Sequence, residues 1–347
     1  MSLRNIPARP KETCSEKGSI GLSRCGVGAS MYDGLRVGLL MSWRLSLVLI
    51  PAAFFVFVLD LYGLLVPLAA LLDPVMALAG LPGEAALVFA TGALITIYPA
   101  IGVMSSLSFT TSEITVIALM ILICHNLFVE TAVQARVGSN PVRIVAVRVL
   151  TAIIVGIAVG RFMGLEPNVN RSLSAEFQLG FPGWSPAVAA FSIWFAGTAR
   201  TVVRIVIIVV LLMIGQRLLE RSGVLRQVAK VFEPVVVLLG LPRSTAFLWI
   251  VGNTLGLTYG AAVILEERGR GELSLEDADL LNHHLAVSHS LFEDTLLFVA
   301  LGAGVVILIV PRLMAAVGVV WLRRLTRSRT RGLLFHRHAD ILKEHKT

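Results

Sequence analysis

The feature that most restricts the fold of this chain is its body, residues 45–322, in which long hydrophobic segments follow one another. The first of them, residues 45–72, contains a single acidic residue and no basic residue. A helix crosses a bilayer in about 20 residues, and a secretory leader has a shorter apolar stretch. The whole chain is 56% hydrophobic and 15% charged, against about 25% charged in soluble domains. The sequence therefore predicts an all-α polytopic membrane protein.

The net charge of +8 lies in the two tails of the chain. Residues 1–44 hold seven basic and three acidic residues, and residues 323–347 hold eight basic and two acidic residues. The segment between them carries 15 basic and 17 acidic residues. Nucleic-acid binding requires a basic folded face, which this distribution does not provide. Basic tails instead fit the cytoplasmic side of a bilayer with anionic lipids, so we expect the bilayer as partner and no nucleic acid.

The hydrophobic body contains an internal repeat. Residues 73–82 contain Asp-Pro-Val and Gly-Leu-Pro, and residues 233–242 contain Glu-Pro-Val and Gly-Leu-Pro at the same spacing. His-Asn-Leu-Phe-Val-Glu-Thr at 125–131 recurs as His-Ser-Leu-Phe-Glu-Asp-Thr at 289–295, 164 residues later. Arg148 and Arg312 are separated by that same interval. Polar residues that recur in order within apolar sequence indicate two related halves.

Each half is predicted to contain one long span, an amphipathic interfacial segment, an interrupted hydrophobic segment and two further spans. In the first half these segments are residues 45–66, 67–81, 83–108, 113–135 and 141–162. In the second half they are residues 199–220, 224–240, 243–266, 275–299 and 303–322. Glycine, proline and hydroxyl residues within the third segments favour a re-entrant hairpin over a kinked span.

The positions of the basic residues favour the same topology. If each half crosses the membrane three times and the N-terminus is inside, the basic loops at 136–143 and 217–230 and the C-terminal tail are cytoplasmic. If the third segments crossed fully, residues 217–230 would be outside. We therefore predict about six transmembrane helices and two re-entrant hairpins. Three crossings per half make the halves inverted repeats.

This topology divides the chain into five predicted parts. They are a basic, disordered cytoplasmic tail (1–44), repeat 1 (45–162), an external connector (163–198), repeat 2 (199–322) and a basic cytoplasmic tail (323–347). We expect the protein in the bacterial inner membrane with both termini in the cytoplasm, and homo-oligomers are compatible with the sequence.

Ionisable residues within predicted spans are costly and are therefore functional candidates. Glu130 lies four residues after Asn126, and Asp294 lies four residues after Ser290, so each pair shares one face of a regular helix. The repeat would bring both pairs to a common site near the midplane. There they would bind a solute, a cation or a proton. The alternative is that Glu130 and Asp294 only pair with buried arginines.

His125 and His289 precede these pairs in the two halves. On a regular helix, side chains five residues apart point about 140° away from each other. His125 and Glu130 would therefore chelate a metal poorly within one half. We favour a proton relay or a hairpin anchor for the histidines. A metal site made of His125, Glu130, His289 and Asp294 remains the alternative.

The interrupted segments contribute neutral polar groups to the predicted binding site. These groups are Thr96, Tyr98, Asn253, Thr254, Thr258 and Tyr259. The ends of broken helices expose unpaired backbone groups that bind solutes and ions. An equally open alternative is that these side chains only satisfy the broken backbone.

The repeated Gly-Leu-Pro, the segment Gly-Asn-Thr-Leu-Gly-Leu-Thr-Tyr-Gly-Ala at 252–261 and the two histidine motifs resemble the nucleoside-recognition (Gate) domain membrane proteins. That superfamily includes spore-maturation membrane proteins, the membrane part of the ferrous-iron transporter and concentrative nucleoside transporters. The resemblance spans residues 45–322 and implies inverted repeats with re-entrant hairpins. It leaves the substrate open.

The function expected from these observations is a secondary transporter. It would move a small polar solute, possibly nucleoside-like, with protons or sodium as the coupling ion and no other cofactor. The alternatives are a divalent-metal permease and a membrane assembly or regulatory protein that transports nothing. The sequence contains neither HExxH nor GxSxG, so we do not expect an enzyme.

Overall fold

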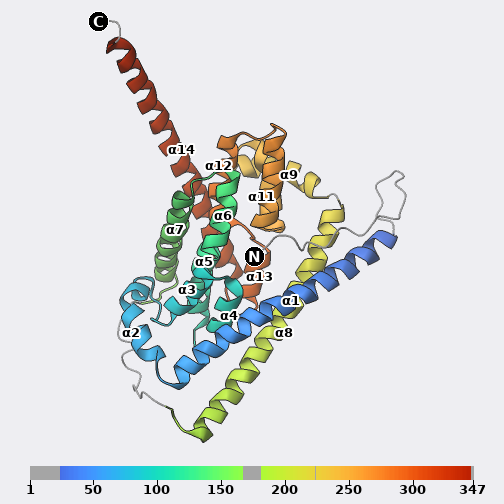
Figure 1. Cartoon of the computed structure of the whole chain (residues 1–347), viewed down its shortest axis with the longest axis vertical. Coiled ribbons are helices and arrows are strands. Elements are labelled where there is room, and N and C mark those ends of the chain that lie inside the picture. Colours follow the sequence, from blue (N-terminus) through green and yellow to red (C-terminus); the bar gives the residue numbers. More distant parts are fainter. Residues whose placement is uncertain (1–23, 167–180, 223, 345–347) are drawn as a thin grey trace.

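The computed structural model describes residues 24–166, 181–222 and 224–344, and these residues form helices and connecting turns without a strand (Figure 1). Five helical stretches in the described chain are long and apolar enough to cross a membrane. They are Val27–Leu61, Thr111–Val137, Pro141–Phe162, Trp184–Ser222 and Val305–Arg327. The prediction of a helical protein with several apolar spans is therefore confirmed.

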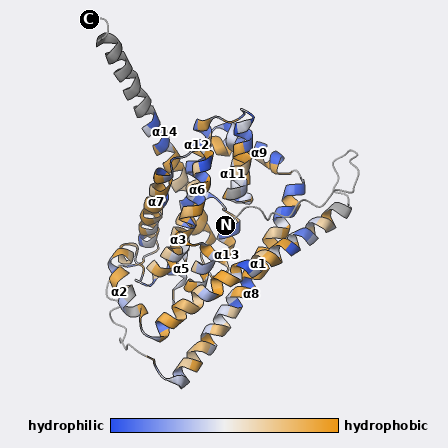
Figure 2. Ribbon diagram, in the orientation of Figure 1, coloured by the Kyte–Doolittle hydropathy of each residue, from blue (hydrophilic) through white to orange (hydrophobic). Residues whose placement is uncertain are grey.

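Two long helices lie side by side at the edge of the molecule (Figure 1). They are α1 (Arg24–Leu61) and α8 (Trp184–Ser222), and their outer surfaces are largely apolar (Figure 2). They run antiparallel, because a Cβ at Gly34 would meet Ile214 and one at Gly38 would meet Val210. Small residues four positions apart allow two helix backbones this close approach.

The first helices of both repeats begin earlier than predicted. α1 starts at Arg24, so residues 24–44 are helical rather than a disordered tail, and α8 starts at Trp184 inside the predicted connector. Contacts with α8 stabilise the polar start of α1: Arg221 donates to Ser30 Oγ at 3.0 Å and to Asp33 Oδ2 at 2.6 Å. Residues 1–23 of the tail and 167–180 of the connector lie outside the described part of the chain.

The rest of the first half surrounds a fully buried helix. Its elements are α2 (Leu65–Met76), the 3₁₀ turn η1 (Ala77–Ala79), α3 (Ala85–Leu94), α4 (Ile97–Ser105), α5 (Thr111–Cys124), α6 (Leu127–Val137) and α7 (Pro141–Phe162). Every residue from Val116 to Cys124 on α5 is buried. α3 and α4 pack against each other across a break at Ile95 and Thr96. α7 coincides with the predicted span 141–162.

The second half has the same order of elements. They are α9 (Val224–Leu238), the 3₁₀ turn η2 (Arg243–Thr245), α10 (Ala246–Thr254), α11 (Leu257–Gly269), α12 (Leu275–Ser288), α13 (Glu293–Val299) and α14 (Val305–Glu344). α10 and α11 pack against each other across a break at Leu255 and Gly256. α14 continues through the predicted C-terminal tail.

Two predicted spans are each divided into two helices. The span 113–135 is interrupted between α5 and α6, and the span 275–299 is interrupted between α12 and α13. The second of these is not among the long apolar helices, because α12 ends at Ser288 and carries Asp279, His283 and His284. The expected count of six long apolar spans is therefore replaced by five in the described residues.

Candidate functional site

The two helix breaks have the same backbone geometry. Asn126 and Ser290 have φ angles of +46° and +51°, and no other non-glycine residue in the described chain has a positive φ. The left-handed region is unfavourable for residues with a side chain, so tertiary contacts must hold it. The Asn126 N–H donates to the Gly92 carbonyl on α3 at 2.9 Å, and the Ser290 N–H donates to the Gly252 carbonyl on α10 at 3.3 Å. Each break is therefore tied to the neighbouring pair of short helices.

A histidine stands at the C-terminal end of each interrupted helix. His125 Nδ1 lies 3.2 Å from the Ile121 carbonyl, and His289 Nδ1 lies 2.8 Å from the Leu285 carbonyl. A carbonyl only accepts hydrogen bonds, so each Nδ1 carries a proton and each neutral ring presents Nε2 as an acceptor. The two Nε2 atoms face each other at 3.3 Å.

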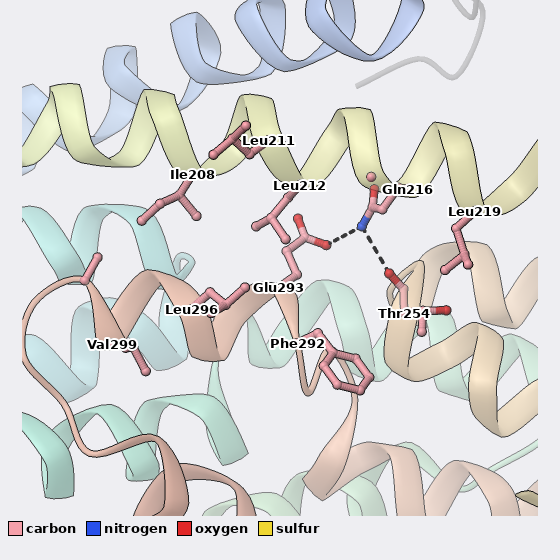
Figure 3. Close-up of a pocket in the computed structure, with 12 residues that line it drawn as sticks. Ile208, Leu211, Leu212, Gln216, Leu219, Thr254, Phe292, Glu293, Leu296 and Val299 are labelled. Carbon is pink, nitrogen blue, oxygen red and sulfur yellow. Dashed lines mark hydrogen bonds between the residues drawn. The ribbon is translucent and has the colours of Figure 1, made fainter. Parts of the chain in front are cut away.

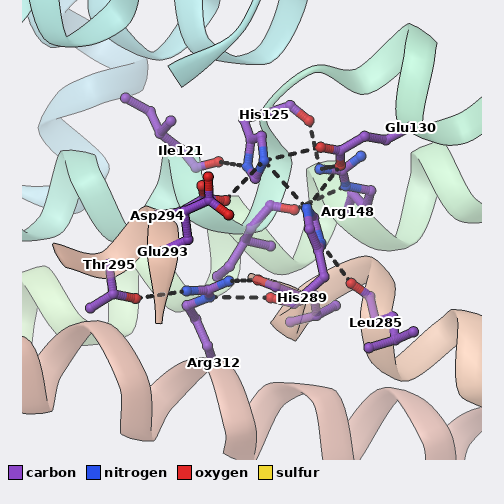
Figure 4. Close-up of polar contacts among 12 residues, drawn as sticks. Ile121, His125, Glu130, Arg148, Leu285, His289, Glu293, Asp294, Thr295 and Arg312 are labelled. Atoms are coloured by element: carbon purple, nitrogen blue, oxygen red, sulfur yellow. Dashed lines mark hydrogen bonds and ion pairs between the residues drawn. The ribbon is translucent and has the colours of Figure 1, made fainter. Parts of the chain in front are cut away.

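Two carboxylates complete this group (Figure 4). His125 Nε2 lies 3.0 Å from Glu130 Oε1 and 3.5 Å from Asp294 Oδ2, and His289 Nε2 lies 3.2 Å from Glu130 Oε2. All four side chains are buried. We call His125, Glu130, His289 and Asp294 the His–acid cluster. The structure thus brings both halves of the chain to one buried centre.

The prediction that His125 and Glu130 point away from each other is wrong. It assumed a continuous helix, but α5 ends at Cys124 and α6 begins at Leu127, with Asn126 in the left-handed conformation between them. The break turns the chain so that Glu130, in the first turn of α6, faces back to His125. For the same reason Asn126 and Glu130 do not share one face of a regular helix.

Two fully buried arginines support the cluster. Arg148 on α7 donates to the carbonyls of Ile123 and His125 at 3.0 and 2.6 Å and pairs with Glu130 Oε2 at 2.7 Å. The last carbonyls of a helix have no partner within the helix, and a cation at this end is favourable. Glu130 therefore pairs with an arginine and also contacts both histidines.

Arg312 on α14 occupies the corresponding place in the second half. It donates to the carbonyls of Val287 and His289 at 3.4 and 2.6 Å and to Thr295 Oγ1 at 3.3 Å. With neutral histidines, the positive charges of the two arginines balance the two carboxylates of the cluster.

The other predicted site residues are not gathered at the cluster. Asn253 is buried and donates to the Trp249 carbonyl, while its Oδ1 has no partner among the described residues. Thr254 donates to the Ile250 carbonyl at 2.7 Å, and Tyr259 is 48% exposed. Thr96 and Tyr98, at the start of α4, are half-buried. The side chain of Thr258 lies outside the described part of the structure.

A second polar network was not predicted. Asp279 on α12 accepts from Ser139 Oγ at 2.8 Å and from Arg323 Nε on α14 at 2.9 Å. Asn282 donates to Ser139 Oγ at 3.1 Å, and Gln134 Nε2 on α6 donates to the Asn282 carbonyl at 3.0 Å. The network joins α6 to α12 and α14. Its signal in the sequence is the run of polar residues at 279–284 within a predicted span.

The chain is similar to the uncharacterized membrane protein YvoD of Bacillus subtilis (strain 168). The two sequences are 31% identical over 285 residues, which cover 82% of this chain and 90% of that relative. No family model matches the chain, and no solved structure matches it. The similarity and the five long apolar helices together indicate an integral membrane protein.

Proposed function

We propose that this chain, which belongs to the same family of membrane proteins as YvoD of Bacillus subtilis, is a proton-coupled secondary transporter of a small solute. The observation that carries the proposal is the His–acid cluster. Ionisable groups buried between the helices of a membrane protein are typical of proton relays and ion pathways. Here four of them, two from each half, lie within hydrogen-bonding range of one another.

The cluster needs a shared cation to be stable. With neutral imidazoles and ionised carboxylates, every atom that the four groups direct at one another is an acceptor. One added proton converts such a contact into a charge-assisted hydrogen bond. Imidazole nitrogen is a ligand for transition metals, whereas the sites of coupling sodium ions are built from oxygen atoms. These arguments favour the proton over sodium as the coupling ion.

The proposal includes an inverted-repeat architecture with two re-entrant hairpins, α3–α4 and α10–α11. It is supported by pairs of positions 164 residues apart that make the same contacts. Arg148 and Arg312 each donate to the carbonyl of the histidine that ends the adjoining helix. Membership of the Gate superfamily, a location in the inner membrane and cytoplasmic termini belong to the same proposal.

Transport into proteoliposomes tests the role of the carboxylates. Uridine and a panel of amino acids and organic acids are first screened for thermal stabilisation of the purified protein, and uptake of a stabilising solute is then driven by an inward proton gradient. We expect Glu130→Gln and Asp294→Asn to abolish gradient-driven uptake, because neither amide can accept and release the coupling proton. Glu266→Gln, at an exposed acid paired with Arg270, is the control. Full uptake by both variants would contradict the proposal.

A divalent-metal permease is the second candidate, and the spacing of the ligand atoms favours it. One ligand atom from each of His125, Glu130 and His289 lies within 4.8 Å of the others. Bonds of about 2.0–2.1 Å at tetrahedral angles place two ligands about 3.3 Å apart. Nδ1–H groups bonded to carbonyls are also the usual support of metal-binding histidines. Against it, a divalent ion would add two charges to a buried site that is already balanced.

Thermal unfolding of the purified protein separates the two candidates. A metal site predicts that Zn²⁺, Fe²⁺ or Mn²⁺ raises the unfolding temperature and that His125→Ala and His289→Ala remove this effect. A protein that is indifferent to all three ions leaves the proton as the occupant of the cluster.

A further inference from the structure

A cavity of about 660 Å³ lies between α8 and α13, beside the break between α10 and α11 (Figure 3). Small-molecule sites have volumes of about 300–1,000 Å³. The walls of this cavity are almost entirely apolar side chains from α8 and α13. They include Ile208, Leu211, Leu212, Leu219, Phe292 and Leu296.

One corner of the cavity is polar. Gln216 Nε2 on α8 donates to Glu293 Oε2 at 2.9 Å and to the Thr254 carbonyl at 3.1 Å (Figure 3). These two bonds use both hydrogens of the amide, so Gln216 has no further donor to offer. Within the described residues, the hydrogen bond from Gln216 is the only one to the Glu293 carboxylate. The corner therefore presents acceptors and the negative charge of an ionised carboxylate.

This carboxylate connects the cavity to the His–acid cluster. Glu293 and Asp294 are consecutive residues at the start of α13. The first projects into the cavity, and the second lies 3.5 Å from His125 Nε2. Any change in the position of this turn of α13 moves both carboxylates together. Occupation of the cavity is thereby linked to the geometry of the cluster.

We propose that the cavity binds an apolar organic molecule that carries one ammonium group. The ammonium pairs with Glu293 and the Gln216 carbonyl oxygen, and the body of the molecule packs on the leucine walls. A carboxylate in an apolar site is costly, and a cationic ligand offsets that cost. A nucleoside would leave several polar groups unpaired against Leu211, Leu212 and Leu296. The inference rests on the proposed transport function, for which it names the substrate class.

Equilibrium binding tests the cavity without a proton gradient. The full chain is placed in nanodiscs of phosphatidylglycerol, a lipid without an amine. The probes are 2-(2-naphthyl)ethylamine and its neutral match 2-(2-naphthyl)ethanol. We expect the amine to bind at least about tenfold more tightly than the alcohol, because only the amine forms a charged hydrogen bond. Glu293→Gln should weaken amine binding about tenfold and change alcohol binding by less than about twofold.

Two further variants control for folding and for the location of the site. Glu220→Gln removes another acid of α8, which pairs with Arg217 outside the cavity, and should leave amine binding unchanged. Leu212→Trp fills the cavity and should abolish binding of both probes. Circular dichroism and elution volume establish that each variant is folded.

Three results would overturn the inference. Equal affinity for amine and alcohol, unaffected by Glu293→Gln, would mean that the cavity only accommodates acyl chains. An oligomer that excludes the amine and separates on Leu212→Trp would mean that a second copy covers it. Absence of saturable amine binding would also refute it. If Glu130→Gln abolishes uptake and retains amine binding, both proposals stand. If uptake in Glu130→Gln is intact while the amine still binds, only the transport proposal fails.

Discussion

At the scale of single residues, the left-handed conformations of Asn126 and Ser290 oppose folding and are held by contacts with other helices. The penalty for an L-residue there is about 1–2 kcal/mol and is smaller for asparagine. We therefore expect Ser290→Gly to raise the free energy of unfolding by about 1 kcal/mol, because glycine adopts this conformation without strain. Thermal or denaturant unfolding of the purified protein in detergent measures the change.

Ala286→Gly supplies the control for this prediction, because it lies within α12. Glycine inside a helix costs about 1 kcal/mol, so the two variants should shift stability in opposite directions. A loss of stability in both would show that contacts of the Ser290 side chain outweigh the backbone strain.

The residues of the His–acid cluster were predictable, but their contacts were not. Repetition of His and acid at an interval of 164 residues identified His125, Glu130, His289 and Asp294. The break after His125 left no local signal, since apolar residues precede and follow it. It depends on the bond from the Asn126 N–H to the Gly92 carbonyl, and such tertiary bonds are invisible in sequence periodicity.

At the scale of secondary-structure elements, the packing of α1 against α8 is set by two glycines. A Cβ at Gly34 would lie 2.5 Å from the Ile214 Cα, which is backbone and cannot move aside as a side chain does. Gly34→Ala should therefore destabilise the protein, by about 1–3 kcal/mol as in other overpacked sites. Gly197→Ala on α8 is the matched control, because a Cβ there meets nothing within 4 Å.

The control should be neutral or stabilise by up to about 1 kcal/mol, since alanine is the better helix former. Thermal unfolding of both variants measures the difference between a close contact and an open surface. If Gly34→Ala proves as stable as Gly197→Ala, α1 is not held against α8 at this distance.

The boundaries of elements were predicted best where local signals mark them. α7 has Asn140 as its N-cap, which accepts from the Arg143 N–H, and Pro141 in its first turn, and its bounds match the predicted span. The start of α1 was missed, because its polar first turns are stabilised by α8 and not by their own sequence. α12 was taken for an apolar span although its polar run argues for a helix buried in protein.

At the scale of the whole molecule, the two halves share a backbone plan but differ in polarity. Positions 279, 283 and 284 of α12 hold Asp and two His, whereas positions 115, 119 and 120 of α5, at the interval of 164, hold Thr, Leu and Met. α5 is thus sealed by apolar side chains, while α12 carries a buried polar network that extends to Arg323. If the halves are inverted, this difference places polar access on one side of the membrane only.

The orientation of the whole molecule gives the last prediction. Three single-cysteine proteins are made on a background without the other native cysteines: one that retains Cys14, one with Glu166→Cys and one with Gln227→Cys. Residues 166 and 227 are exposed in the structure and flank α8. We expect a membrane-impermeant maleimide to label only Glu166→Cys in intact cells, because the basic loop around Gln227 and the N-terminal tail should be cytoplasmic. Permeabilised cells should label all three.

The same experiment separates the two topologies of the interrupted segments. If α3 and α4 form a re-entrant hairpin, the first half crosses the membrane an odd number of times and its end lies opposite the N-terminus. If they cross fully, that number becomes even, and Glu166→Cys lies on the same side as Cys14. Labelling of Gln227→Cys but not Glu166→Cys from outside, with Cys14 protected, would therefore reject the hairpin. It would also reject the inverted repeat, because each half would then cross an even number of times.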